Sequence, residues 1–186
     1  MTLPRRLLDV IEKDILPLTR EGVARGNKVF GAAVLRRDDL SLVLAETNNE
    51  TECPLWHGEV HCIKRLYERG LADPGSQVFL STHEPCTMCA SALAWAGFDT
   101  VWFLFSHEDS RDAFAIPHDL RILQEVFGGA YHRRNSFWTA TPIRDLIAAD
   151  PDRDRLRAQD ARIRAAYDDL SRAYQSGKSA NAIPLN

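Results

Sequence analysis

The segment from residue 57 to residue 105 alternates between helical and strand patterns, and this alternation constrains the fold more than any other feature. A helical stretch over 57–69 is followed by an apolar strand at Val78–Thr82, a helix from Pro85 through Ala96 and a buried strand at Thr100–Phe105. Strands joined through a helix run parallel with right-handed crossovers, and both faces of their sheet are covered. The alternation therefore predicts an α/β domain.

Two apolar runs before this segment predict a further pair of strands. Val29–Leu35 and Leu42–Ala45 are separated by a short polar stretch, which is typical of an antiparallel hairpin. A fifth strand is expected at 131–138, after a loop over 106–117 and a short helix that ends at Gly128. The fold class that follows is a three-layer α/β/α sandwich around a mixed sheet of roughly five strands.

The chain of 186 residues has about the length of one domain. We expect an amphipathic helix over 3–25, which Pro17 kinks or ends early, and a charged helix over 152–175. Residues 1–176 would then form a single domain, with 177–186 as a flexible tail. Neither a signal peptide nor a membrane-spanning stretch is evident, so we expect a cytoplasmic protein with no membrane partner.

Composition limits the class of protein further. Hydrophobic residues make up 45% and charged residues 26% of the chain, which excludes a disordered protein or a coiled coil. The net charge of −3 excludes a protein that coats nucleic acid by bulk electrostatics. Four cysteines are too few for a disulfide scaffold, so the two that lie three positions apart need another explanation.

These two cysteines, Cys86 and Cys89, lie at the start of a predicted helix, where both sulfur atoms can point toward one metal ion. The helix N-terminus also favours the thiolate form that a metal requires. His57, at the start of the neighbouring helix, supplies a third ligand. Three protein ligands leave one position open on a tetrahedral Zn²⁺, as in catalytic zinc sites.

Glu59 follows His57 by two residues, and on a regular helix the two side chains would diverge by about 200°. We therefore expect His57 to occupy a cap or loop position, from which both side chains reach the same site. A carboxylate beside the zinc can exchange protons with a water molecule that the zinc activates. Glu59 is thus the predicted catalytic residue.

Other interpretations of these residues are weaker. A lone C-x-x-C pair can be a redox pair, but the partner residues at 57 and 59 argue against it. His57 and His61 have the spacing of a metalloprotease helix, which requires glutamate directly after the first histidine, and position 58 is glycine. His83, directly before the cysteine motif, is left open between a pocket wall and the core.

His57-Gly58-Glu59 together with Pro85-Cys86-Thr-Met-Cys89 matches the zinc-deaminase signature H-x-E…P-C-x-x-C. The segment from about Val29 to Phe105, with Phe30-Gly-Ala-Ala-Val as its first strand, resembles the cytidine-deaminase-like superfamily. The resemblance implies that fold, hydrolytic deamination of an aminated ring with Glu59 as the proton carrier, and a homo-oligomer. We expect a homodimer.

The resemblance also implies contacts to the substrate from the backbone at Gly58 and Glu84, and from the side chain of Asn48. His107 and Asp109 follow the strand at Thr100–Phe105, and ligand sites of α/β proteins lie at the carboxyl ends of strands. These two residues are therefore further candidates for contacts that set specificity.

Motif details point to more than one substrate. His-Gly-Glu is similar to free cytosine deaminases, whereas Glu-Pro-Cys-x-Met-Cys is similar to guanine and tRNA adenosine deaminases. Acidic residues interleave with the arginines of 152–175, which argues against a tRNA-binding face. We expect a zinc-dependent aminohydrolase acting on a free nucleobase, a nucleoside or a similar amino-heterocycle. A tRNA adenosine deaminase is the alternative, and a catalytically idle, zinc-stabilised interaction module is disfavoured because Glu59 would then have no role.

Overall fold

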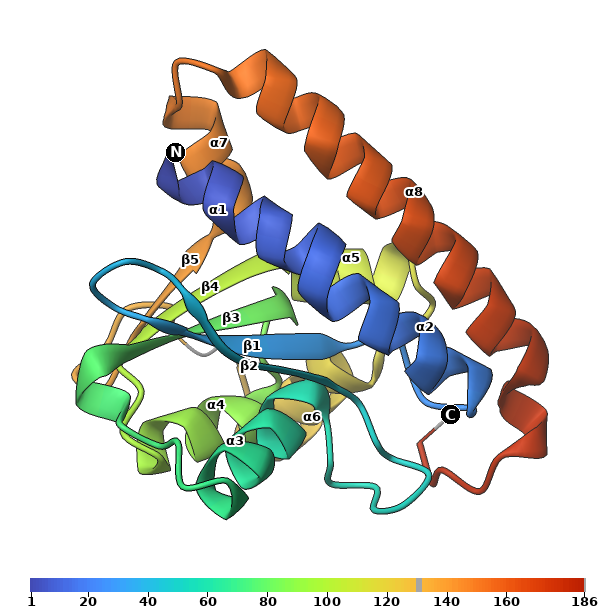
Figure 1. The fold of residues 1–186 in the computed structure, drawn as a ribbon. Helices are drawn as coiled ribbons and strands as arrows, with labels where there is room; N and C mark the ends of the chain where they lie inside the picture. The colour runs from blue at the N-terminus through green and yellow to red at the C-terminus, as the bar shows by residue number, and fades with distance from the viewer. Residues whose placement is uncertain (130–131, 186) are drawn as a thin grey trace.

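The predicted hairpin and the predicted parallel strands belong to one mixed sheet (Figure 1). The computed structural model describes residues 1–129 and 132–185. The sheet has the order β2-β1-β3-β4-β5, with β1 antiparallel to both its neighbours and β3, β4 and β5 parallel. The strands are β1 (Gly31–Arg36), β2 (Leu42–Thr47), β3 (Gln77–His83), β4 (Thr100–Phe105) and β5 (Thr139–Pro142). The predicted α/β class and the mixed five-stranded sheet are confirmed.

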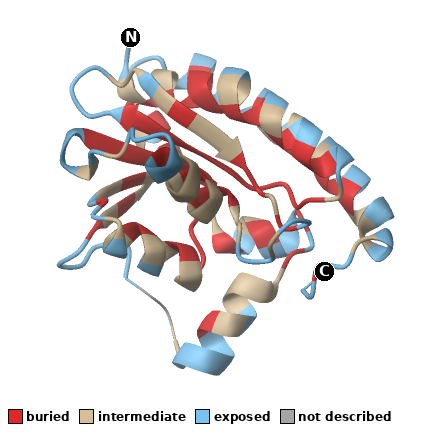
Figure 2. Cartoon of the chain, turned by 60° about the horizontal axis from the view of Figure 1, so that its bottom comes forward, coloured by how far each residue is buried: buried red, intermediate tan, exposed pale blue. Residues whose placement is uncertain are grey.

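Both faces of the sheet are apolar because alternate residues of each inner strand point in opposite directions. In β1, Ala33 and Leu35 belong to one hydrophobic core, whereas Ala32 and Val34 belong to the other. The three inner strands, β1, β3 and β4, are accordingly buried along most of their length (Figure 2). A sheet of this kind needs helices on both sides, which makes the three layers.

The helices divide between the two faces of the sheet (Figure 1). One face is covered by α1 (Leu3–Val10), η1 (Ile11–Ile15), α2 (Leu16–Ala24), α7 (Ile143–Ala149) and α8 (Arg153–Gly177). The other face is covered by α3 (Gly58–Glu68) and α4 (Thr87–Trp95), with α6 (His118–Phe127) beside α4.

The N-terminal helix continues through Pro17 without ending. One π-helical stretch, η1, separates α1 from α2, and Pro17 falls in the first turn of α2. Proline cannot donate the backbone hydrogen bond of a helix interior, and a π-helical turn is one way in which a helix absorbs such an interruption. The predicted helix over 3–25 is therefore confirmed, with its irregularity placed just before the proline.

The structure corrects two predictions made for the middle of the chain. The fifth strand is β5 at 139–142 rather than 131–138, of which residue 131 lies outside the described residues. Asn135 Oδ1 accepts hydrogen bonds from the N–H groups of Phe137 and Trp138, so this stretch turns instead of extending. The expected loop at 106–117 contains a short helix, α5 (His107–Asp112), which begins with a capping box between Ser106 and Asp109.

The C-terminal helix is confirmed and extends to Gly177, while α7 was not predicted. The segment after it, for which the sequence predicts a flexible tail, contacts the domain. Asn181 Nδ2 donates to Gly26 O at 2.9 Å, and the side chain of Ile183 is buried. No helix in the described part of the chain combines the length and the apolar character that a membrane crossing requires.

His83 lies in the core and does not line a pocket wall. It is 3% exposed, and its Nδ1 lies 2.9 Å from Thr82 Oγ1. Four aromatic rings surround it, those of Phe30, Phe105, Phe114 and Tyr167. Burial in these surroundings lowers the pKa of His83 to about 3.

This shift predicts a pH-dependent contribution to stability. The pKa of His83 is about 3 in the folded chain and 6.5 for an ordinary histidine, so acidification protonates the unfolded state first and favours unfolding. Between pH 6 and pH 3, the wild type should lose about 1.4 kcal/mol per pH unit more than the His83→Leu variant. Urea unfolding at several pH values, at equal zinc and protein concentrations, measures the difference. Parallel pH profiles for the two proteins would contradict a neutral, buried His83.

Candidate active site

His57 occupies the N-cap position of α3, as the sequence predicts. Its backbone is extended (φ −59°, ψ 159°), and the helix begins at the next residue. Because His57 lies outside the regular helix, its side chain does not diverge from that of Glu59 by the helical angle. The cap therefore lets both side chains reach one site.

Cys86 occupies the equivalent position on α4. The helix begins at Thr87, two residues later than expected from Pro85, because Cys86 acts as the N-cap. Its sulfur accepts a hydrogen bond from the backbone N–H of Cys89 at 3.5 Å. A sulfur that accepts from a helix N-terminus is favoured in its thiolate form.

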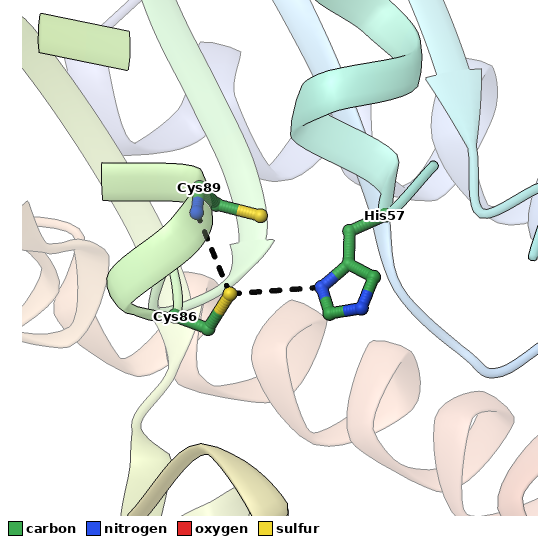
Figure 3. Close-up of side chains that lie close together, drawn as sticks. All are labelled: His57, Cys86 and Cys89. Carbon is green, nitrogen blue, oxygen red and sulfur yellow. Dashed lines mark hydrogen bonds between the residues drawn. The ribbon is translucent and has the colours of Figure 1, made fainter. Parts of the chain in front are cut away.

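His57, Cys86 and Cys89 come together at the starts of these two helices (Figure 3). One ligand atom from each residue lies within 4.8 Å of the other two, and Cys86 Sγ is 3.6 Å from His57 Nδ1. For a tetrahedral zinc with ordinary bond lengths, a sulfur and a nitrogen ligand are about 3.6 Å apart. The three side chains thus fit a zinc ion, with His57 Nδ1 as the nitrogen ligand and a fourth position open.

The electrostatics of Cys86 also suit a metal. A hydrogen bond from Cys89 and the contact with His57 lower the pKa of the Cys86 thiol well below its ordinary value. Burial disfavours a charged His57, but the hydrogen bond and the charge of Cys86 outweigh burial and raise the pKa of His57 to about 9. Cys86 is thus held as a thiolate, which is the form that binds zinc.

Glu59, in the first turn of α3, is almost fully buried. Burial and the nearby charge of Cys86 raise the pKa of its carboxyl group above the ordinary value. Ser81 Oγ on β3 donates a hydrogen bond to Glu59 Oε1 at 2.7 Å, which holds the carboxyl group in place. Ser81 was not predicted from the sequence, although strand alternation places it on the same face as Phe79, toward the helices that carry the ligands.

Gly58 allows α3 to start directly against β1. A Cβ atom at this position would lie 2.9 Å from the Cα atom of Gly31, and backbone atoms cannot move aside as a side chain can. The N–H of Gly58 donates to Asn48 Oδ1, and Asn48 Nδ2 donates to Glu50 Oε2 at 2.7 Å. The two groups predicted to contact the substrate, the N–H of Gly58 and the side chain of Asn48, are therefore hydrogen-bonded to each other.

The other three predicted substrate contacts are also used within the protein. Glu84 accepts two hydrogen bonds from Arg133 and one from the N–H of His107. His107 Nε2 lies 3.1 Å from Pro85 O, and Asp109 pairs with arginines of α7 and α8. Their structural roles are to hold the turn before α4 and the start of α5.

A cavity of about 240 Å³ opens at His57 and Cys86. None of the five predicted substrate contacts is among the described residues that line it. The side chains of Asn48, Glu84, His107 and Asp109 are turned to protein partners, and the five positions stay predicted substrate contacts. Besides His57 and Cys86, the described residues that form the walls of the cavity are Lys28, Phe30, Glu50, Pro54, Leu55, Thr87, Met88, Ile116, His118, Asp119, Ile122, Ile183, Pro184 and Leu185.

Asp119 is the acidic residue of α6 in this cavity wall. Burial, reinforced by the charge of Cys86, raises the pKa of its carboxyl group to about 7. The sequence predicts a helix here but does not single out Asp119, because nothing in the spacing of Asp119 relates it to the zinc motif. Only the packing of α6 beside α4 brings Asp119 to the site.

The contact between Ser81 and Glu59 predicts an effect on catalysis without an effect on zinc. In Ser81→Ala the carboxyl group of Glu59 loses its hydrogen bond, and we expect kcat to fall about tenfold to a hundredfold. Ser81→Thr keeps the hydroxyl group and should keep most of the activity. Steady-state kinetics and elemental analysis check both variants, and a Ser81→Ala enzyme with wild-type kcat would contradict the role.

Known proteins with similar sequences and folds are deaminases. The chain is 29% identical to guanine deaminase of Bacillus subtilis over 133 residues, which cover 69% of this chain and 83% of that protein. The X-ray structure of guanine deaminase from Bacillus subtilis has a TM-score of 0.54 at 26% identity, covering 83% of this chain and 95% of that one. Guanine deaminase from Nitrosomonas europaea shares the fold, with a TM-score of 0.51 at 19% identity over 88% of this chain and 85% of that one.

The family match covers the whole of the zinc site. Residues 12–105 match the cytidine and deoxycytidylate deaminase zinc-binding region, and they include both helix starts described above. The geometry of the three ligands and the buried glutamate agree with that match. The chain belongs to the family of cytidine and deoxycytidylate deaminase zinc-binding proteins and is a zinc-dependent hydrolytic deaminase.

Proposed function

We propose that the chain hydrolyses the amino group of guanine, or of a closely related free amino-heterocycle, to an oxo group with release of ammonia. The observation that carries this proposal is the small cavity at His57 and Cys86. Its volume of about 240 Å³ lies below the range of about 300–1,000 Å³ in which drug-sized ligands bind. A single base suits this volume better than a nucleotide of a folded RNA.

The lining of the cavity favours a flat ring with polar edges. Phe30, Ile116 and Ile122 offer apolar surface to the faces of such a ring. Asp119 offers a carboxylate that accepts hydrogen bonds from N–H groups, and guanine carries ring and amino N–H groups side by side on one edge. The likeness to guanine deaminase of Bacillus subtilis supports the same substrate.

In this proposal His57, Cys86 and Cys89 hold the zinc, which supplies the activation of water as a nucleophile. Glu59 accepts a proton from the attacking water and delivers it to a ring nitrogen. A new C–O bond forms at the carbon that bears the amino group. Glu59 then passes the second proton to the amino group, the C–N bond breaks, and the products are the oxo-base and ammonia.

The charges of α8 support a small substrate over tRNA. Four of its six arginines pair with acidic residues of the same chain: Arg157 with Asp154, Arg162 with Glu12, Arg164 with Asp109, and Arg172 with Asp169. A face that binds RNA presents cations to phosphates, and its affinity falls steeply with salt. Paired arginines are poorly suited to that task.

Ammonia release from a panel of guanine, cytosine, adenine, their nucleosides and a tRNA tests the substrate. We expect the highest kcat/KM with guanine, and a loss of about tenfold to a hundredfold with guanine in Asp119→Asn. Asp112→Asn, an aspartate of α5 exposed to solvent, is the matched control and should behave as the wild type. Turnover of the tRNA alone would overturn the proposal in favour of a tRNA adenosine deaminase.

A second variant tests the proton carrier and separates an enzyme from an idle zinc module. Glu59→Gln keeps the shape of the side chain but cannot accept the proton, so we expect a loss of at least about a hundredfold in kcat. The variant should still hold one zinc per chain, whereas His57→Ala should not, as elemental analysis will show. Wild-type turnover by Glu59→Gln would contradict the mechanism.

A further inference from the structure

A buried ion pair lies in the wall of the cavity, outside the sequence motif. Lys28 Nζ is 2.7 Å from Glu50 Oε1, and the two side chains are only 5% and 1% exposed. Taking two charges out of water costs free energy that their attraction rarely recovers in full, so a buried pair is weak evidence for a stabilising role. Its position beside His57 suggests another role.

Glu50 contacts both the zinc-ligand ring and the segment that carries it. His57 Nε2 lies 3.6 Å from Glu50 Oε1, on the side of the ring opposite the nitrogen that faces Cys86. Glu50 Oε2 accepts from Asn48 Nδ2, and Asn48 Oδ1 accepts from the N–H of Gly58. The carboxylate of Glu50 therefore lies against the His57 ring directly and is linked to the start of α3 through the side-chain amide of Asn48.

The two nitrogens of the ring then have different tasks. A histidine that binds a metal through Nδ1 carries its proton on Nε2, and an acceptor near that proton fixes the tautomer and the orientation of the ring. Glu50 is the acidic side chain that faces Nε2 among the described residues. Lys28 balances the charge of Glu50, so the carboxylate remains in place in a buried wall.

We propose that Glu50, charge-balanced by Lys28, is a positioning residue that holds His57 in the tautomer and orientation in which Nδ1 binds zinc. Glu50 acts through His57 and Asn48 and does not touch the reacting atoms. The inference rests on the proposed zinc site.

The test measures zinc affinity by competition with a chelator. The variant Lys28→Met/Glu50→Gln removes both charges while it keeps the shape of the two side chains, so no unpaired charge is left behind. We expect its zinc affinity to fall about tenfold to a hundredfold, the usual effect of removing a group that orients a metal ligand. The matched control is Lys64→Met/Glu68→Gln, the same chemistry in an exposed pair on α3, and its affinity should not change.

Glu50→Asp keeps the charge pair but withdraws the carboxylate from His57 by one methylene group. We expect a loss of zinc affinity here as well, and this variant carries the test if the double variant does not fold. Denaturant unfolding of each protein shows whether the fold is kept. If both variants fold and both bind zinc with wild-type affinity, the inference on Glu50 is overturned while the zinc site is retained. If the double variant does not fold, wild-type zinc affinity in Glu50→Asp alone has the same consequence. A wild-type chain that binds no zinc would overturn both.

Discussion

The antiparallel pairing of β1 with both of its neighbours is the constraint on which the site depends. Because β2 and β3 flank β1 and both run opposite to it, these two strands point the same way and end at one edge of the sheet. The chain leaves β2 toward α3 and leaves β3 toward α4, so His57 and Cys86 are delivered to the same place. Gly31 N–H donates to Thr82 Oγ1, which ties the start of β1 to the end of β3 at this edge.

The site gathers buried charges and polar groups that a core would ordinarily exclude. Cys86 and Asp119 line one cavity, and Glu59 is buried in the first turn of α3. Each of the three has a pKa displaced from its ordinary value by burial and by its neighbours. Such displaced groups concentrate at functional sites because catalysis needs them and stability does not. Specific partners compensate part of the free-energy cost of burial, as Ser81 does for Glu59 and Lys28 for Glu50.

Sequence patterns predicted the elements wherever apolar periodicity was strong. The hairpin, the strands at 78–82 and 100–105 and the N-terminal helix all depend on repeating apolar positions, and the structure confirms them. The errors fall where a few polar side chains decide the backbone: Asn135 turns the chain before β5, and Ser106 with Asp109 starts a helix in an expected loop. Local hydrogen bonds of this kind produce no repeating apolar pattern in the sequence.

The sequence by itself determined the zinc-binding chemistry of this protein. Histidine, glutamate and two cysteines at fixed spacing, each at the start of a helix, define a metal site with a carboxylate beside it, because the spacing within a helix turn is set by local geometry. The tertiary structure alone decided which residues surround the cavity at His57 and Cys86. It turns Asn48, Glu84 and Asp109 to protein partners and brings Asp119 and Glu50 to the cavity. The physical reason is that these side chains meet through the packing of distant segments, which no spacing along the chain encodes.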